Sequence, residues 1–68
     1  MKDFNMDVFN EWKQDTQDYS MIKDVNVYIK RISNDCIHYC ITVLGMIPQD
    51  AWIIANNVHI TESNRLLK

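Results

Sequence analysis

The segment Cys36-Ile37-His38-Tyr39-Cys40 carries three side chains that could bind a metal. A zinc site needs a tetrahedron of sulfur and nitrogen ligands. On a helix Cys36 and Cys40 share a face but His38 points away, whereas on a strand the two cysteines would lie about 13 Å apart. Neither geometry forms a site from this segment alone, although His59 could add a ligand. We therefore expect two core cysteines and no bound metal.

The same cysteines and histidines raise nucleophilic catalysis, which also requires an orienting third group, an oxyanion hole and a pocket. The chain has one glycine, Gly45, and contains no G-x-S-x-G, P-loop or H-E-x-x-H motif. A single glycine cannot easily supply a tight backbone cradle for a phosphate or an oxyanion. We expect no enzymatic activity and no cofactor.

Five acidic residues near the N-terminus are spaced four, four, four and three residues apart: Asp3, Asp7, Glu11, Asp15 and Asp18. On a helix this spacing gathers carboxylates on one arc, where each like-charged (i, i+4) pair costs about 0.2–0.5 kcal/mol. The row is a solvated outer face, a docking surface for a basic protein, or an imitation of nucleic-acid phosphates. In a fourth interpretation, basic residues of the same chain or of a second copy face it, namely Lys23, Lys30 and Arg31.

We hypothesise that the chain is a non-enzymatic protein-binding module, of the adaptor or inhibitor type, which presents this acidic row to a basic partner protein. Long-range attraction would steer the partner, and apolar surface near Phe4, Phe9 or Trp12 would then be buried. The predicted partner-binding residues are Asp3, Asp7, Glu11, Asp15, Asp18, Phe9 and Trp12.

The C-terminal sequence IIANNVHITESNRLLK, within residues 51–68, resembles the helix-turn-helix of small DNA-binding regulators. The positions that match its inner face and the start of its recognition helix are Ile54, Ala55, Val58, Ile60 and Thr61. The chain departs from the pattern at His59, where the turn usually has glycine, and at Arg65, where the second helix usually has an apolar residue. The resemblance implies an alternative function, DNA-binding regulation, and nucleic acid is an expected partner only in that alternative. Its DNA-contacting residues would be Thr61, Asn64, Arg65 and Lys68.

The acidic row requires a helix over residues 3–18, which the apolar spacing also predicts. Asp3 is the expected N-cap of this helix. The apolar stripe beside the acids consists of Phe4, Val8, Trp12 and Tyr19, with Phe9 at its flank.

A second, long helix is predicted after a cap at Ser20, because apolar residues recur at steps of three and four across residues 22–43. Gly45 and then Pro48 form a helix-stop signature. The recurring residues are Ile22, Val25, Ile29, Ile32, Cys36, Tyr39 and Val43. This seam is either core or a dimer interface. The predicted oligomer interface consists of Ile22, Val25, Ile29, Ile32 and Tyr39.

An alternative for residues 24–44 is a β-hairpin that turns at Asn34-Asp35. β-Branched and aromatic residues, which favour strands, recur at every second position on both sides of this turn: Val25, Val27 and Ile29 before it, and Ile37, Tyr39, Ile41 and Val43 after it. The sequence leaves this choice open. The fold class we expect is all-α, a small helical bundle with a long central helix, and the alternative is α+β.

After Pro48, a third helix is predicted over residues 48–57, with Trp52, Ile53, Ile54 and Ala55 facing inward. Thr61 would cap a last short helix with the sequence ESNRLLK.

Sixty-eight residues predict one domain, residues 1–68, and 47% of them are hydrophobic. A chain of this size hides only about 60% of its surface, so we expect a homo-oligomer or a bound partner. The net charge of −2 argues against a general polyanion binder. The sequence shows neither a signal peptide nor a membrane-spanning apolar stretch, so a cytoplasmic protein without membrane contact is expected.

Overall fold

The computed structural model describes residues 3–67, which form three α-helices and no strand. They are α1 (Met6–Thr16), α2 (Val25–Thr42) and α3 (Pro48–Leu66). The prediction of a small all-α bundle with a long central helix is confirmed, and the α+β alternative is wrong because α2 occupies the proposed hairpin.

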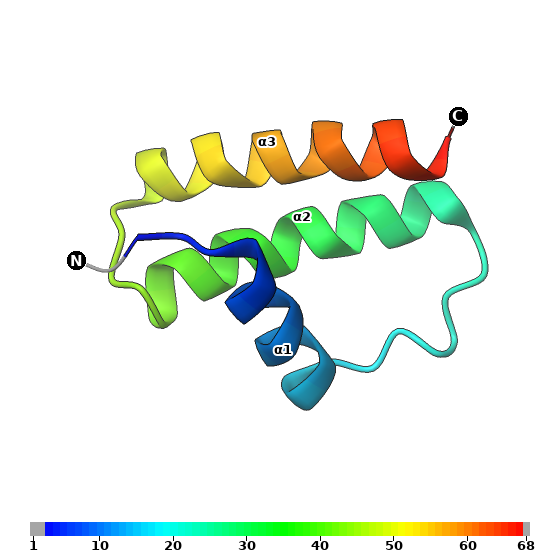
Figure 1. The fold of residues 1–68 in the computed structure, drawn as a ribbon, viewed down its shortest axis with the longest axis horizontal. Coiled ribbons are helices and arrows are strands. Elements are labelled where there is room, and N and C mark those ends of the chain that lie inside the picture. The colour runs from blue at the N-terminus through cyan, green and yellow to red at the C-terminus, as the bar shows by residue number, and fades with distance from the viewer. Residues whose placement is uncertain (1–2, 68) are drawn as a thin grey trace.

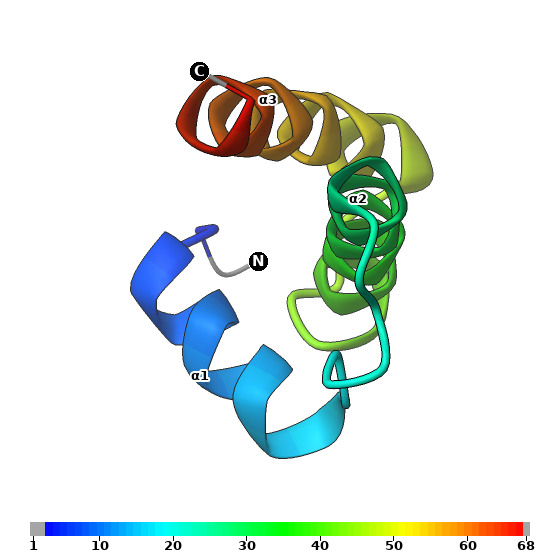
Figure 2. The same ribbon diagram turned by 90° about the vertical axis from the view of Figure 1, so that its right-hand side faces the viewer.

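The helices α2 and α3 run antiparallel, side by side, along the longest dimension of the molecule (Figure 1). In the end-on view the three helices lie at the corners of a triangle, and α1 runs at an angle to the α2–α3 pair (Figure 2). Its Cα atoms approach those of α2 at few places, because bulky side chains lie between the two helices. The long, extended segment between α1 and α2 runs to the far end of α2 (Figure 1).

The first helix is shorter than predicted at both ends. Asn5, not Asp3, is its N-cap: Asn5 Oδ1 accepts hydrogen bonds from the backbone N–H groups of Asp7 at 2.9 Å and Val8 at 3.3 Å. Gln17 is already extended and ends the helix. Asparagine and aspartate are equally effective N-caps, so either Asp3 or Asn5 could begin the helix, and the chain uses Asn5.

The second helix begins at Val25 instead of directly after Ser20. Asp24 is its N-cap and accepts hydrogen bonds from Asn26 N–H at 2.8 Å and Val27 N–H at 3.3 Å. Ser20 instead donates its backbone N–H to Asp18 Oδ1 at 2.9 Å, within the extended connection. The predicted cap at Ser20 is therefore wrong.

The turn between α2 and α3 agrees with the predicted helix stop. Gly45 has a φ of +71°, a value that disfavours residues with a side chain. The backbone N–H of Met46 then folds back and donates to the carbonyl of Cys40 at 2.9 Å. Pro48 occupies the first turn of α3, where its missing N–H leaves no hydrogen bond unformed.

The third helix continues to Leu66 without interruption, so the predicted break near Thr61 is wrong. Residues 49–67 contain neither glycine nor proline, so nothing local ends the helix. Its buried face consists of Ala51, Ala55, Val58 and Glu62, at steps of four, three and four. Trp52 and Ile53, which were predicted to face inward, lie beside this face and are exposed, Trp52 to 63%.

The core lies where α2 meets both neighbours. Its buried apolar residues are Phe9, Ile32, Cys36, Tyr39, Cys40, Leu44, Met46, Ala51, Ala55 and Val58. Ile29, Ile32 and Tyr39 are buried within the single chain, so the predicted oligomer interface is wrong at these three positions. Of that predicted interface, only Val25 is exposed, and Ile22 is half-buried.

Candidate functional site

Three of the five predicted acidic residues form a continuous surface on the outer side of α1. Asp7, Glu11 and Asp15 are separated by one helical turn each and are all exposed; we call them the acidic face. Asp3 and Asp18 are also exposed but lie outside the helix, in the segments before and after it. The hydrogen bonds from Ser20 lower the pKa of Asp18 and favour its charged form.

No basic side chain of the described residues neutralises the acidic face. Arg31 forms an ion pair with Asp35 at 3.3 Å and donates a hydrogen bond to Gln17 Oε1 at 3.1 Å. Within residues 3–67, neither Lys23 nor Lys30 forms an ion pair. For Asp7, Glu11 and Asp15, the interpretation in which these three basic residues of the same chain face the acidic row is therefore wrong, whereas Arg31 contributes to the lowered pKa of Asp18.

The only cation of α1, Lys13, points away from the acidic face into the molecule and is 8% exposed. Its Nζ lies 5.4 Å from the ring centre of Phe9 and 5.8 Å from that of Tyr19. Burial lowers the pKa of Lys13, and the nearby Glu62 carboxylate partly opposes this shift. The burial of Lys13 follows from that of Phe9, because the two residues are one helical turn apart.

Phe9 was predicted to contact a partner, but it is fully buried and this prediction is wrong. Its ring packs against those of Phe4, Trp12 and Tyr39, with centroid distances of 5.6, 6.0 and 5.3 Å. Trp12 is half-buried, so part of its ring remains accessible next to the acids. Val8 was placed in the inner stripe by sequence, yet it is 50% exposed and borders Asp7 and Glu11. Val8 therefore adds apolar surface next to the acidic face, although its spacing predicted that it would face inward.

The two cysteines are free, and both are buried in the core. Burial and the neighbouring Cys40 raise the pKa of Cys36 to about 12, and burial also raises the pKa of Cys40. These thiols remain protonated near neutral pH, and a thiol is a much weaker nucleophile than a thiolate. His38 is exposed, on a different side of α2. Among residues 3–67, no three His, Cys, Asp or Glu side chains cluster as metal ligands.

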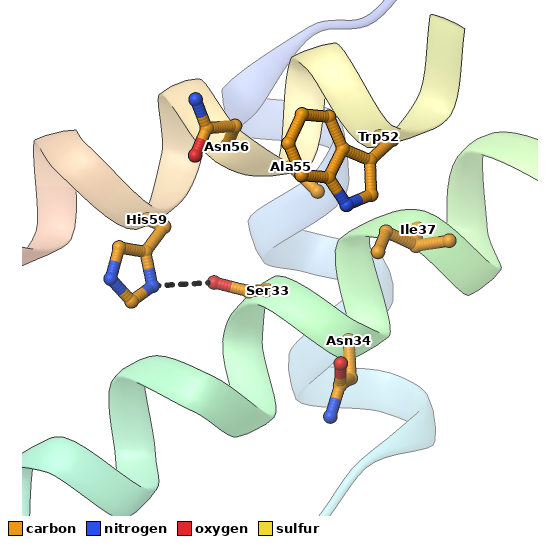
Figure 3. Close-up of a pocket in the computed structure, with 7 residues that line it drawn as sticks. All are labelled: Ser33, Asn34, Ile37, Trp52, Ala55, Asn56 and His59. Carbon is orange, nitrogen blue, oxygen red and sulfur yellow. Dashed lines mark hydrogen bonds between the residues drawn. The ribbon is translucent and has the colours of Figure 1, made fainter. Parts of the chain in front are cut away.

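A shallow hollow of about 240 Å³ between α2 and α3 is lined by Ser33, Trp52 and His59, among others (Figure 3). Ser33 Oγ and His59 Nδ1 point toward one another and lie 3.2 Å apart (Figure 3). Ser33 Oγ also donates to the carbonyl of Ile29 at 3.0 Å, and while it does so the same oxygen can accept from an Nδ1–H of His59. The pair connects α3 to α2.

Three residues of the DNA-binding alternative, Thr61, Asn64 and Arg65, lie on α3. Thr61 and Asn64 are exposed on α3, and Arg65 donates two hydrogen bonds to Glu62 Oε2, at 2.6 and 3.2 Å. Lys68 lies outside the described residues. Because α3 is continuous, the predicted helix-turn-helix within residues 51–68 is wrong.

No protein-family model, curated protein or solved structure matches this chain, so no functional residue can be transferred from a relative. Over residues 3–67, no helix combines the length and the apolar character needed to cross a lipid bilayer.

Proposed function

We propose that the chain is a non-enzymatic protein-binding module whose acidic face docks on a basic surface of a partner protein, as an adaptor or inhibitor would. One observation carries this proposal: Asp7, Glu11 and Asp15 are exposed together while the only cation of their helix, Lys13, is buried behind them. The outer surface of α1 is therefore negative without an internal counter-charge among residues 3–67.

The arrangement is unfavourable for an isolated helix. The pairs Asp7–Glu11 and Glu11–Asp15 each cost about 0.2–0.5 kcal/mol through repulsion. Within residues 3–67, the carboxylates of Asp7, Glu11 and Asp15 form no hydrogen bond that would offset this repulsion. A basic partner surface would remove this repulsion and would also attract the chain over several ångströms before contact. Val8 and the accessible part of Trp12 would supply the apolar contact once docked.

A second copy of the chain is a candidate partner. Lys23 and Lys30 are exposed near the start of α2 and form no ion pair within residues 3–67, so they could meet the acidic face of another molecule. Trp52, Ile53 and Ile60 are at least half exposed on α3 and offer apolar surface for the same association. We also propose a cytoplasmic location, because reduced, unpaired cysteines such as Cys36 and Cys40 are usual there.

The proposal is tested by neutralising the acidic face with Asp7→Asn, Glu11→Gln and Asp15→Asn together. A control removes an acidic charge outside the predicted partner-binding residues, with Asp50→Asn on α3. Wild-type and variant chains are used to capture proteins from the cells that make the chain, and sedimentation velocity measures self-association in parallel. We expect the first variant to lose its partner and the control to keep it. Equal capture by both variants and the wild type would contradict the proposal.

A further inference from the structure

A cavity of about 500 Å³ lies between the inner side of α1 and the α2–α3 pair. Its charged lining consists of Lys13, Glu62 and Arg65, and Met6, Tyr19 and Tyr28 line it as well. Asn10, on the same side of α1 as Lys13, adds an amide. The acidic face lies on the opposite side of α1, so this cavity is a separate site. Its volume lies within the range of about 300–1,000 Å³ that is usual for sites of small organic ligands.

The cavity contains one more positive charge than negative charge. Glu62 is buried, and its carboxylate is already engaged by Arg65 through two hydrogen bonds. Lys13 is more than nine-tenths buried but forms neither a hydrogen bond nor an ion pair with any of residues 3–67. The rings of Phe9 and Tyr19 near its Nζ compensate only part of the lost hydration. Among the charged side chains that line the cavity, Lys13 alone has no ion-pair partner within residues 3–67.

The ammonium group of Lys13 can be reached from the cavity. In the part of the chain that the structure describes, no side-chain nitrogen or oxygen that is fully enclosed lacks a hydrogen-bond partner. Because Lys13 Nζ has no partner, it is not fully enclosed, and Lys13 is among the residues that line the cavity. A ligand atom in the cavity could therefore approach Nζ directly.

We propose that this cavity binds a small organic monoanion through its carboxylate, with the carboxylate on Lys13 and the apolar body against Tyr19 and Tyr28. A ligand with one negative charge would bring the total charge of Lys13, Arg65, Glu62 and the ligand to zero. A dianion would make this total negative, beside the Glu62 carboxylate. The two tyrosine rings, which lie 5.5 Å apart in an edge-to-face arrangement, favour an aromatic or aliphatic body over a purely inorganic ion.

The test uses benzoate and hexanoate as probes, with benzamide as a neutral isostere of benzoate and inorganic phosphate as an inorganic anion. Two-dimensional ¹H–¹⁵N NMR follows the backbone amides of the full chain during each titration. We expect saturable shifts at Asn10, Lys13 and Tyr28 with the two carboxylates, and at least about tenfold weaker binding of benzamide, because a charge-assisted hydrogen bond is lost. No saturable shift with either carboxylate, or equal binding of benzamide, would overturn the proposal. Tighter binding of phosphate than of both carboxylates would do so as well.

Two variants assign the binding to Lys13. Lys13→Met keeps an unbranched side chain one atom shorter than lysine and removes its charge, and Lys30→Met removes an exposed charge as the matched control. We expect Lys13→Met to weaken benzoate binding about tenfold or more and Lys30→Met to leave it unchanged. Unchanged binding in Lys13→Met would overturn the proposal.

If Lys13→Met does not fold, a measurement on the wild-type chain tests the same assignment. The pKa of Lys13 is followed through its ¹³Cε shift with and without saturating benzoate. A bound carboxylate should raise this pKa, because it stabilises the ammonium form. An unchanged pKa at saturation would place the benzoate away from Lys13 and would overturn the assignment.

Discussion

The two sides of α2 are packed in different ways. On one side, α3 presents Ala51, Ala55 and Val58, whose small side chains let the two backbones approach closely along their length. On the other side, α1 presents Phe9, Trp12 and Lys13, which are too large for such an approach. The ring centroids of Phe9 and Trp12 lie 5.3 and 5.1 Å from the ring centroid of Tyr39 on α2. Large side chains thus attach α1 through a few contacts, and a cavity with polar lining remains beneath it.

This difference indicates a division of roles. The α2–α3 pair has the longer helices and the closer packing, so we expect it to be the more stable part of the molecule. Helix α1 carries the acidic face on its outer side and Lys13, the residue proposed to bind the carboxylate, on its inner side. The functional surfaces therefore lie on the less densely packed element, as is common in small binding proteins.

The largest expected effect is the loss of the aromatic attachment of α1. Phe9→Ala removes a fully buried ring, and we expect the free energy of unfolding to fall by about 3–5 kcal/mol. Val8→Ala, on the exposed side of the same helix, should change it by less than about 0.5 kcal/mol. Urea denaturation followed by circular dichroism measures both. Equal effects of the two substitutions would mean that α1 does not pack through Phe9.

The close packing of the other side is tested by adding volume. Ala55→Leu places three more carbon atoms between α2 and α3, and we expect a loss of about 1–3 kcal/mol. Asn57→Leu, on the exposed face of α3, is the control and should change the stability by less than about 0.5 kcal/mol. Thermal unfolding compares the two. If Ala55→Leu is as stable as the control, the α2–α3 contact is looser than the structure shows.

The buried thiols predict a loss of stability at alkaline pH. Cys36 has a folded-state pKa of about 12, whereas an unfolded cysteine titrates near about 8.5. Between these values the unfolded chain releases a proton that the folded chain keeps, so this thiol lowers the free energy of unfolding by about 1.4 kcal/mol per pH unit. Lys13 acts in the opposite direction, because its lowered pKa makes the unfolded chain bind more protons below the ordinary lysine value.

The alkaline prediction is checked by urea denaturation at several pH values from about pH 8.5 to about pH 10, under reducing conditions. Stability should fall with pH in the wild type and fall less steeply in Cys36→Ala. Identical slopes would show that Cys36 is not protected from ionisation.

The smallest expected effect concerns the acidic face itself. Glu11→Gln removes two repulsive pairs, with Asp7 and with Asp15, and should stabilise the chain by about 0.4–1 kcal/mol at low salt. The gain should shrink at high salt, which screens exposed charges. Denaturant midpoints at two salt concentrations measure it. A loss of stability would mean that Glu11 has a structural role in α1.

The glycine and the proline between α2 and α3 predicted the end of one helix and the start of the next correctly, whereas the caps predicted at Asp3, Ser20 and Thr61 were wrong. Gly45 adopts a positive φ and Pro48 begins a helix, and both preferences hold whatever packs around them. The recurring apolar residues of α2 also predicted its buried face at Ile29, Ile32 and Tyr39. What that face packs against was not predictable from periodicity, since a core and a dimer interface require the same spacing.

The rotation of α1 about its axis was not predictable. Val8 and Trp12 define one stripe, and Phe9 and Lys13 define another, about 100° away around the helix. The first stripe has the more apolar composition, so the sequence favoured it. The structure instead buries Phe9 against Tyr39, and this brings Lys13 inward with it. A lysine is rarely buried, so no sequence pattern would have placed Lys13 beside Glu62.

The association rate constant with the captured partner tests the central claim most directly. Stopped-flow fluorescence of Trp12 and Trp52 compares the wild type with the chain lacking the charges of Asp7, Glu11 and Asp15, at low and at physiological salt. We predict that wild-type association is about tenfold faster at low salt and slows steeply as salt is added, whereas the neutral variant is slow and insensitive to salt. Equal rates with equal salt dependence would contradict the account, because the acidic face would then have no part in binding.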